Sequence, residues 1–282
     1  MFDSVTIIGV GLISGSFSLA LKENGLAKNI IGVSRTQASI DKALELGLID
    51  EALPLEEAVK KSDLIYVAIP VDATVPMMRK IMDLINDKQI VADAGSTKNV
   101  LCKNLENHPM RKRFVATHPM WGTEYSGPEA AVHGAFAGRI CVICEKEKSD
   151  EDAVNTMESI YKKLGMNIAY MNADSHDMHA AYVSHISHIT SFALANTVLE
   201  KEKEEDAIFE LAGGGFESTV RLAKSSPSMW LPVFKQNREN ILDVLNEHIV
   251  QLRKFKSCLE KENYEYLQEL MEHANEIKRI LK

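Results

Sequence analysis

Short apolar runs alternate with helix-like apolar spacing over the first 172 residues. The runs are bounded by turn residues and are too short for buried helices, so they predict strands. Such alternation is typical of an α/β fold built on a mostly parallel, doubly wound sheet. The predicted strands cover residues 5–9, 29–34, 64–69, 90–92, 114–117, 140–143 and 167–170.

Two helices in this region carry recognisable end signals. Gly47 follows a helical pattern over residues 36–46 and suits the left-handed position that ends many helices. Ser149 and Asp152 stand three residues apart and predict a capping box at the start of a helix that ends near Gly165.

The pattern changes after Asn172, because strand-like runs stop there. Helices are predicted over residues 174–200, from Asn237 onward and from about Tyr264. We therefore expect two domains, 1–172 and 173–282, the second all-helical and able to pack against another copy through its long apolar stripe. That stripe consists of Ile241, Leu242, Leu245, Ile249, Leu252 and Phe255.

Three features interrupt the helical half. The mostly acidic run from Glu200 to Asp206 predicts a solvated helix end or loop. The glycines 213–215 break the chain, and Pro227 and Pro232 are expected to frame a turn.

Bulk properties exclude several classes of protein. The 282 residues are 45% hydrophobic, and the formal net charge of −8 argues against binding to nucleic acid. The negative net charge does not exclude a small anionic substrate, because a local group of Arg and His side chains is enough to bind one. We find no leader and no apolar run near membrane-spanning length, so we expect no membrane association and a cytoplasmic location.

The four cysteines are too few and too scattered to predict a disulfide framework. Cys141 and Cys144 form a C-x-x-C pattern inside a strand-like run. At that spacing the two side chains point to opposite faces of a strand, so we predict neither a redox nor a metal role for them.

A glycine-rich turn follows the first predicted strand. Gly9 allows a tight turn, and Gly11 lets backbone N–H groups approach a pyrophosphate at the start of a helix. The third glycine is Gly15, with Ser14 at the commoner glycine position. Because the motif lies between a strand and a helix, it indicates dinucleotide binding rather than an ordinary turn. The predicted cofactor-binding residues of this turn are Gly9, Gly11, Leu12, Ile13 and Gly15.

The end of the second strand bears on the choice of cofactor. NAD-binding folds place an acidic residue there, about 20 positions after the glycines. This strand ends in Val33, Ser34, Arg35 and Thr36, without an acid. Arg35 can pair a 2′-phosphate, and the Ser34 and Thr36 hydroxyls can hydrogen-bond to it. We therefore predict NADP, with NAD as the second candidate and a plain surface arginine as the structural alternative.

Candidate chemistry lies at strand ends and on the first helix of the second half. His118 precedes a proline, so its backbone is extended and its imidazole reaches the edge where open sheets bind ligands. Ser96 follows another strand at that edge. His185 and His188 are three apart and share a helix face. Such spacing also suits a metal, but no acid or cysteine completes a ligand set, so we predict no metal site.

Several motifs in order resemble the prephenate/arogenate dehydrogenase family of tyrosine biosynthesis. They are His118-Pro119-Met120 with Gly122-Thr123-Glu124 and Ser126-Gly127; Ser184-His185 with His188; Gly213-Gly214-Gly215-Phe216; and Arg221 with Ser226-Pro227 and Met229-Trp230. The resemblance spans essentially the whole chain. It implies an N-terminal Rossmann-type domain, a helical dimerisation domain that shares the active site, and a homodimer.

The resemblance also implies oxidative decarboxylation of a 1-carboxy-4-hydroxycyclohexadiene, either prephenate or arogenate. His118 fits the general base, because imidazole titrates near working pH. Ser96 is expected to orient His118 or the substrate 4-hydroxyl, and Arg221 to anchor the ring carboxylate. His188 is implied near the substrate side chain. The remaining predicted substrate-binding residues are Ser184 and Glu124 at the edge of the pocket, Trp230 near the subunit boundary, and Glu217.

Glu217 follows Phe216, where some prephenate-preferring relatives carry lysine. A carboxylate there would attract the ammonium group of arogenate and repel the keto acid of prephenate, unless it points into solvent. We therefore expect good activity with arogenate, alongside or ahead of prephenate.

Three alternatives stay open at this point. One is an NAD-dependent, prephenate-specific enzyme, and another is an NADP-sensing module without turnover. The third is a different NADP-dependent dehydrogenase, such as one for β-hydroxy acids. That class usually needs a catalytic lysine in the helical domain, and the predicted helix offers none before Lys201.

Overall fold

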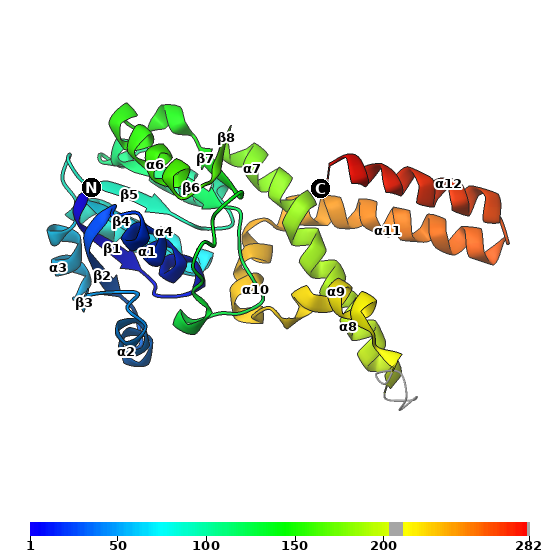
Figure 1. Cartoon of the computed structure of the whole chain (residues 1–282). Helices are drawn as coiled ribbons and strands as arrows, with labels where there is room; N and C mark the ends of the chain where they lie inside the picture. The colour runs from blue at the N-terminus through cyan, green and yellow to red at the C-terminus, as the bar shows by residue number, and fades with distance from the viewer. Residues whose placement is uncertain (203–210, 281–282) are drawn as a thin grey trace. The chain divides into compact units, whose positions relative to one another are not determined.

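The computed structural model describes residues 1–202 and 211–280 (Figure 1). In this part an eight-stranded sheet has the order β3-β2-β1-β4-β5-β6-β7-β8, and every neighbouring pair is parallel except β6 with β7. The strands are β1 (Phe2–Ile8), β2 (Ala27–Val33), β3 (Glu51–Ala52), β4 (Leu64–Val67), β5 (Ile90–Asp93), β6 (Phe114–Pro119), β7 (Ile140–Cys144) and β8 (Asn167–Met171).

All predicted strands are confirmed, and so is the doubly wound fold. The sequence pattern missed β3, because two residues are too few to show an alternation. The helices around the sheet are α1 (Leu12–Glu23), α2 (Gln37–Glu45), α3 (Leu55–Lys61), α4 (Val71–Leu84), α5 (Asn99–Leu105) and α6 (Glu151–Lys163).

Each face of the sheet has its own apolar core. One core takes side chains from α1, α2 and α6, and the other takes them from α3, α4 and α5 (Figure 1). Cys141 belongs to the first core and Cys144 to the second, which confirms that they point to opposite faces. Both thiols are free and buried.

The predicted capping box at Ser149 is wrong. Helix α6 begins one residue later, and its N-cap, Asp150, makes no side-chain cap bond. The Ser149 hydroxyl donates to the Phe114 carbonyl at 2.6 Å, and the Asp152 carboxylate pairs with Arg113 at 2.8 Å. Bonds to neighbouring segments therefore occupy both side chains that would form the box.

Every described element after residue 172 is a helix, as predicted. Helix α7 (Ala173–Ala180), a π-helical turn (Ala181–His185) and α8 (Ile186–Glu202) form one continuous segment. The acidic run begins at the end of α8, and its residues 203–206 lie outside the described part. The glycine run becomes the start of α9 (Gly214–Val220).

The expected turn between Pro227 and Pro232 is instead helix α10 (Pro227–Gln236). Pro227 occupies the first turn, where the missing N–H costs nothing. Pro232 lies inside the helix and removes one backbone hydrogen bond. Burial of Trp230 and Val233 against Val71 supplies the packing that stabilises the helix despite this loss.

The chain forms two compact units, Met1–Asn237 and Arg238–Lys282. The second unit contains α11 (Arg238–Glu260) and α12 (Tyr264–Ala274), at the positions predicted for the last two helices. The predicted domains, 1–172 and 173–282, divide the chain elsewhere and remain a prediction.

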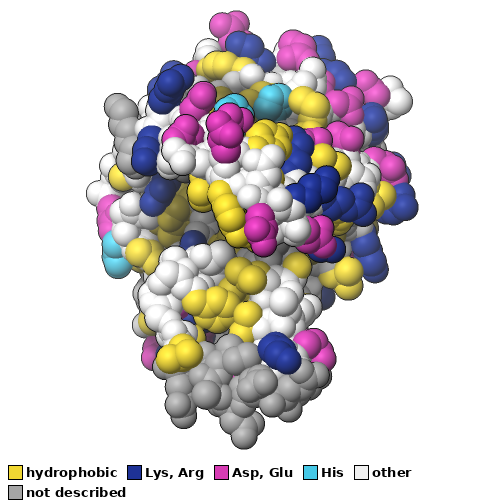
Figure 2. Space-filling view, turned by 90° about the vertical axis from the view of Figure 1, so that its right-hand side faces the viewer, with side chains coloured by type: hydrophobic (Ala, Val, Ile, Leu, Met, Phe, Trp, Pro, Cys, Tyr) yellow, Lys and Arg dark blue, Asp and Glu magenta, His cyan; other side chains and the backbone are white. Residues whose placement is uncertain are grey.

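On the face shown in Figure 2, charged side chains of both signs gather in the upper part, with hydrophobic ones between them. No helix within residues 1–202 and 211–280 is both long and apolar enough to span a membrane. In the first helical segment after the sheet the exposed large hydrophobic residues are Met178, Tyr182, Val183 and Leu199.

Candidate active site

The glycine turn joins β1 to α1 and has the geometry that a bound phosphate requires. Gly9 has φ +87°, and a Cβ there would lie 2.6 Å from the Ala68 carbonyl oxygen, so only glycine fits. A Cβ on Gly11 would meet nothing within 4 Å, which leaves open space beside the backbone. Leu12 and Ile13 begin the helix, where N–H groups lack partners inside the helix and favour anions.

The unusual glycine spacing has a structural cause. The Ser14 hydroxyl lies 3.0 Å from the Gly11 amide and also bonds the Gly9 carbonyl, so it ties the turn together. Gly15 serves packing, because a Cβ there would lie 2.8 Å from that of Ala131. The departure from the commoner motif therefore strengthens the turn.

The loop after β2 presents the residues predicted to select the cofactor. Arg35 is exposed and Ser34 half-buried. Thr36 is the N-cap of α2, and its hydroxyl accepts from the Ser39 amide. Thr36 therefore has a structural task, whereas the guanidinium of Arg35 is accessible to a ligand.

His118 lies near the end of β6, the antiparallel partner of β7. Its Nδ1 lies 2.8 Å from Nε2 of His176, and Nδ1 of His176 lies 2.8 Å from the Asp177 carboxylate. That carboxylate accepts the backbone amides of Lys98 at 2.7 Å and Asn99 at 3.0 Å. A chain of buried hydrogen bonds thus connects His118 to the start of α5.

Burial is the main cause that holds the pKa of His118 well below its ordinary value, and the nearby His176, Lys98 and His185 side chains add to it. The imidazole is therefore neutral at neutral pH. A neutral imidazole at a ligand-binding edge can accept a proton from a substrate hydroxyl.

Ser96 lies half-buried in the loop after β5. Asp93 and Lys98 form a fully buried ion pair at the base of this loop, and the Thr97 hydroxyl donates to Gln236 at 2.7 Å. Within the described residues it is His176, not Ser96, that bonds Nδ1 of His118. A role for Ser96 toward the substrate hydroxyl remains a prediction.

A π-helical turn lies between α7 and α8, and the buried face of the segment continues through it. Ala180 and Ala181 are buried, His185 follows Ala181 by four residues, and His188 follows by three more. Ser184, beside this buried face, is half-buried.

His188 stacks on Trp230 with ring centroids 3.5 Å apart, and His185 contacts the edge of the same indole. Burial lowers the pKa of each histidine to about 4. Nδ1 of His188 and Nε1 of Trp230 are buried without a partner among the described residues. Buried polar atoms that lack partners are costly in a finished core, so these two suit a ligand-binding position.

Arg221 pairs with Glu124 at 2.7 Å and is half-exposed. Its hydrogen bond helps to lower the pKa of Glu124, after the backbone bond of Glu124 itself. Glu217 is exposed and pairs with Lys224 at 3.4 Å. The structure thus joins Arg221 to one predicted site residue and gives Glu217 a cationic neighbour.

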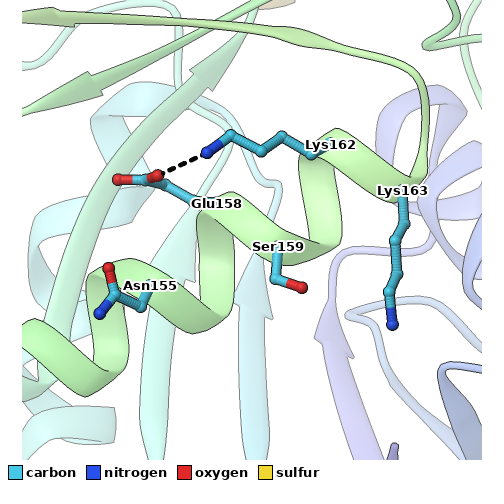
Figure 3. A pocket seen from close by; sticks show the side chains of 5 residues that line it. All are labelled: Asn155, Glu158, Ser159, Lys162 and Lys163. Atoms are coloured by element: carbon cyan, nitrogen blue, oxygen red, sulfur yellow. Dashed lines mark hydrogen bonds and ion pairs between the residues drawn. The ribbon is translucent and has the colours of Figure 1, made fainter.

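No sequence motif pointed to His176, Asp177 and Lys98 as parts of the site. His176 and His179 stand three apart on a predicted helix, which by itself is typical of packing or surface positions. That helix pattern carries no sign that His176 faces a strand end 58 residues away. A hollow on α6 was also not predicted; Asn155, Glu158, Ser159, Lys162 and Lys163 line it (Figure 3). It contains none of the predicted site residues.

A Rossmann-type domain with a glycine turn before α1, a neutral buried imidazole and an accessible arginine are together typical of a nicotinamide dinucleotide-dependent dehydrogenase. Comparison with known proteins identifies which kind of dehydrogenase this is. Residues 17–170 match the family model "Prephenate dehydrogenase, nucleotide-binding domain", and residues 172–273 match "Prephenate dehydrogenase, dimerization domain". The chain belongs to the prephenate/arogenate dehydrogenase family and is an NAD(P)-dependent oxidoreductase.

Individual relatives agree with this assignment. Prephenate dehydrogenase of Bacillus subtilis is 31% identical over 95% of this chain and 73% of its own length. Cyclohexadienyl dehydrogenase of Zymomonas mobilis is 26% identical over 100% of this chain and 97% of its own. The crystal structure of prephenate dehydrogenase from A. aeolicus with hydroxyphenyl propionate and NAD+ is similar at TM-score 0.89 and 31% identity, over 99% of this chain and 98% of that one.

Proposed function

We propose that this protein is an NADP-preferring dehydrogenase that decarboxylates arogenate and prephenate, with His118 as its general base. The observation that carries the proposal is the neutral, buried imidazole of His118, bonded through Nδ1 and close to a sheet edge. The bound dinucleotide would take the hydride from C4 of the ring. His118 would take the proton of the 4-hydroxyl, and carbon dioxide would leave as the ring becomes aromatic.

The glycine turn and the loop after β2 fit a dinucleotide. Open space beside Gly11 and the unpaired N–H groups of the first turn of α1 would hold the pyrophosphate. Arg35, exposed and next to a capped helix start, supports a 2′-phosphate contact. The relative from A. aeolicus is described with NAD+, so NAD is the alternative.

Arg221 would anchor the ring carboxylate, which both substrates share. For this it would exchange or share its contact with Glu124, and a bidentate carboxylate pair would replace a single bond at 2.7 Å. His188, Trp230 and Ser184 would line the space around the substrate side chain.

Glu217 would favour arogenate through its negative charge. Lys224 weakens this effect, because it pairs with the same carboxylate, and the exposure of both side chains weakens it further. We therefore expect Glu217→Gln to lower kcat/KM for arogenate by about threefold more than for prephenate. Ser218→Ala is the matched control on the same helix. Equal changes for both substrates would contradict a role of Glu217 in selectivity.

A homodimer through the helical domain also belongs to the proposal. The match to a dimerization domain over residues 172–273 and the exposed Tyr182, Val183 and Leu199 support it. We further propose a cytoplasmic location, in keeping with biosynthetic chemistry on polar metabolites.

One assay tests the proposal as a whole. Steady-state formation of NADPH and NADH is measured with prephenate and with arogenate, in all four combinations. The proposal expects turnover of both substrates and a higher kcat/KM with NADP+. No turnover of arogenate would overturn the proposed substrate range, and a preference for NAD+ would overturn the proposed choice of cofactor.

A further inference from the structure

The chain His118–His176–Asp177 is a buried polar system that the sequence motifs do not contain. His176 and Asp177 are each 2% exposed and lie on α7, whereas His118 lies on β6. We infer that His176 and Asp177 are positioning residues that fix the tautomer of His118, so that its Nε2 is the basic nitrogen. This inference rests on the proposed role of His118 as the base.

The positions of the ring hydrogens on His176 and His118 can be assigned by starting from the Asp177 carboxylate. A carboxylate is only an acceptor, and this one already accepts two backbone amides and faces Nδ1 of His176. Nδ1 of His176 therefore carries a hydrogen. In a neutral imidazole the other nitrogen, Nε2, is then an acceptor, and it faces Nδ1 of His118 at 2.8 Å.

With a neutral His176, His118 carries its hydrogen on Nδ1, and the lone pair is on Nε2. The described residues place no partner on Nε2. The opposite arrangement would set a bare Nδ1 of His176 against the Asp177 carboxylate, and two acceptors in contact repel each other. The same logic fixes the imidazole of a serine protease through its aspartate.

The other charged and titratable groups around His118 do not fix its tautomer. The Lys98 ammonium is held by Asp93 in a fully buried ion pair. His185 bonds Asn237 at 3.0 Å through its Nδ1. Of the groups that face His118, only His176 has a ring nitrogen at hydrogen-bond distance from it.

Asp177 also has a structural task, because it bonds the backbone at the start of α5 and its carbonyl accepts from Asn237 at 2.7 Å. His176 makes no such backbone contact through its ring. Variants of His176 therefore separate the positioning role from the stability of the fold better than variants of Asp177.

The direct test is the tautomer of His118 in the wild-type protein. Nitrogen chemical shifts of ¹⁵N-histidine-labelled protein distinguish protonated from bare ring nitrogens, and the spectrum of His118→Asn assigns the signals. We expect hydrogen on Nδ1 and a bare Nε2 at pH 7.5. Hydrogen on Nε2 would overturn the inference, whatever the kinetics show.

Kinetics of His176 variants give the second test. His176→Leu should lower kcat by about 10²-fold, with KM and dinucleotide affinity changed less than about threefold. His176→Gln keeps an oxygen acceptor for Nδ1–H and should recover at least about a tenth of wild-type kcat. The control His179→Leu, on the exposed face of α7, should match wild type.

Failure of the inference and failure of the proposed function give different results. If His176→Leu keeps wild-type kcat while His118→Asn is inactive, His118 is still supported as the base, and the positioning role of His176 is contradicted. If His118→Asn itself keeps its activity, the proposed function fails, although the tautomer measured in the wild type still stands.

Discussion

Ionisable residues around the candidate site are mostly neutral or paired. The pKa of His185 and that of His188 lie near 4, so both rings are uncharged at neutral pH. The charge of the Lys98 ammonium is balanced by the Asp93 carboxylate in a buried ion pair. Arg221 is the permanent cation among the residues predicted to bind substrate, and it is the natural partner for a ring carboxylate.

Arg221→Ala should therefore lower kcat/KM for both substrates by about 30-fold or more, which corresponds to about 2 kcal/mol. Dinucleotide affinity should stay within about twofold. Steady-state kinetics and a dinucleotide titration measure the two effects, with Arg139→Ala as an exposed arginine control. A loss confined to one substrate would show that Arg221 contacts the side chain instead.

Single residues were predictable where the local sequence restricts the backbone. Pro119 holds His118 extended, and the glycine turn follows a clear strand. His176 was not predictable as a partner of His118, because the contact joins α7 to β6 and no local pattern encodes it. The pairing of Arg221 with Glu124, 97 positions apart, is also a tertiary contact.

At the scale of elements, the strands and most helices follow the apolar pattern. The exceptions have physical causes: β3 is too short, and packing of Trp230 and Val233 overrides the proline signal in α10. The π-helical turn has no sequence signature, and the buried positions before and after it, His176, His185 and His188 among them, keep helical spacing.

The loop between β2 and α2 allows a test of cofactor choice without loss of the helix cap. Ser34→Asp with Arg35→Ala keeps Thr36 and its bond to Ser39. The ratio of kcat/KM for NADP+ to that for NAD+ should fall by about tenfold or more, because a charge-assisted bond to phosphate contributes about 1.5–3 kcal/mol. Lys42→Ala is the control cation on α2. An unchanged ratio would assign phosphate recognition to other residues.

At the scale of the whole molecule, the site draws on distant parts of one compact unit. The β6 strand supplies His118, α7 and α8 supply the other histidines, and α10 supplies Trp230. The Thr97 hydroxyl donates to the Gln236 side chain, and the Gln236 amide donates to the Val71 carbonyl, so these bonds connect the nucleotide-binding domain to α10. Movement of these elements would therefore alter the proposed base and the proposed substrate contacts together.

The pH dependence of kcat in wild type and His118→Asn tests the central claim most directly. Since burial holds the pKa of His118 well below its ordinary value, the proposed base is active above that lowered pKa, and kcat should fall only well below the pH range in which a free imidazole titrates. His118→Asn should lose this acid limb and about 10²–10⁴-fold in kcat while dinucleotide binding is retained. A variant with near-normal kcat and the wild-type acid limb would contradict the account.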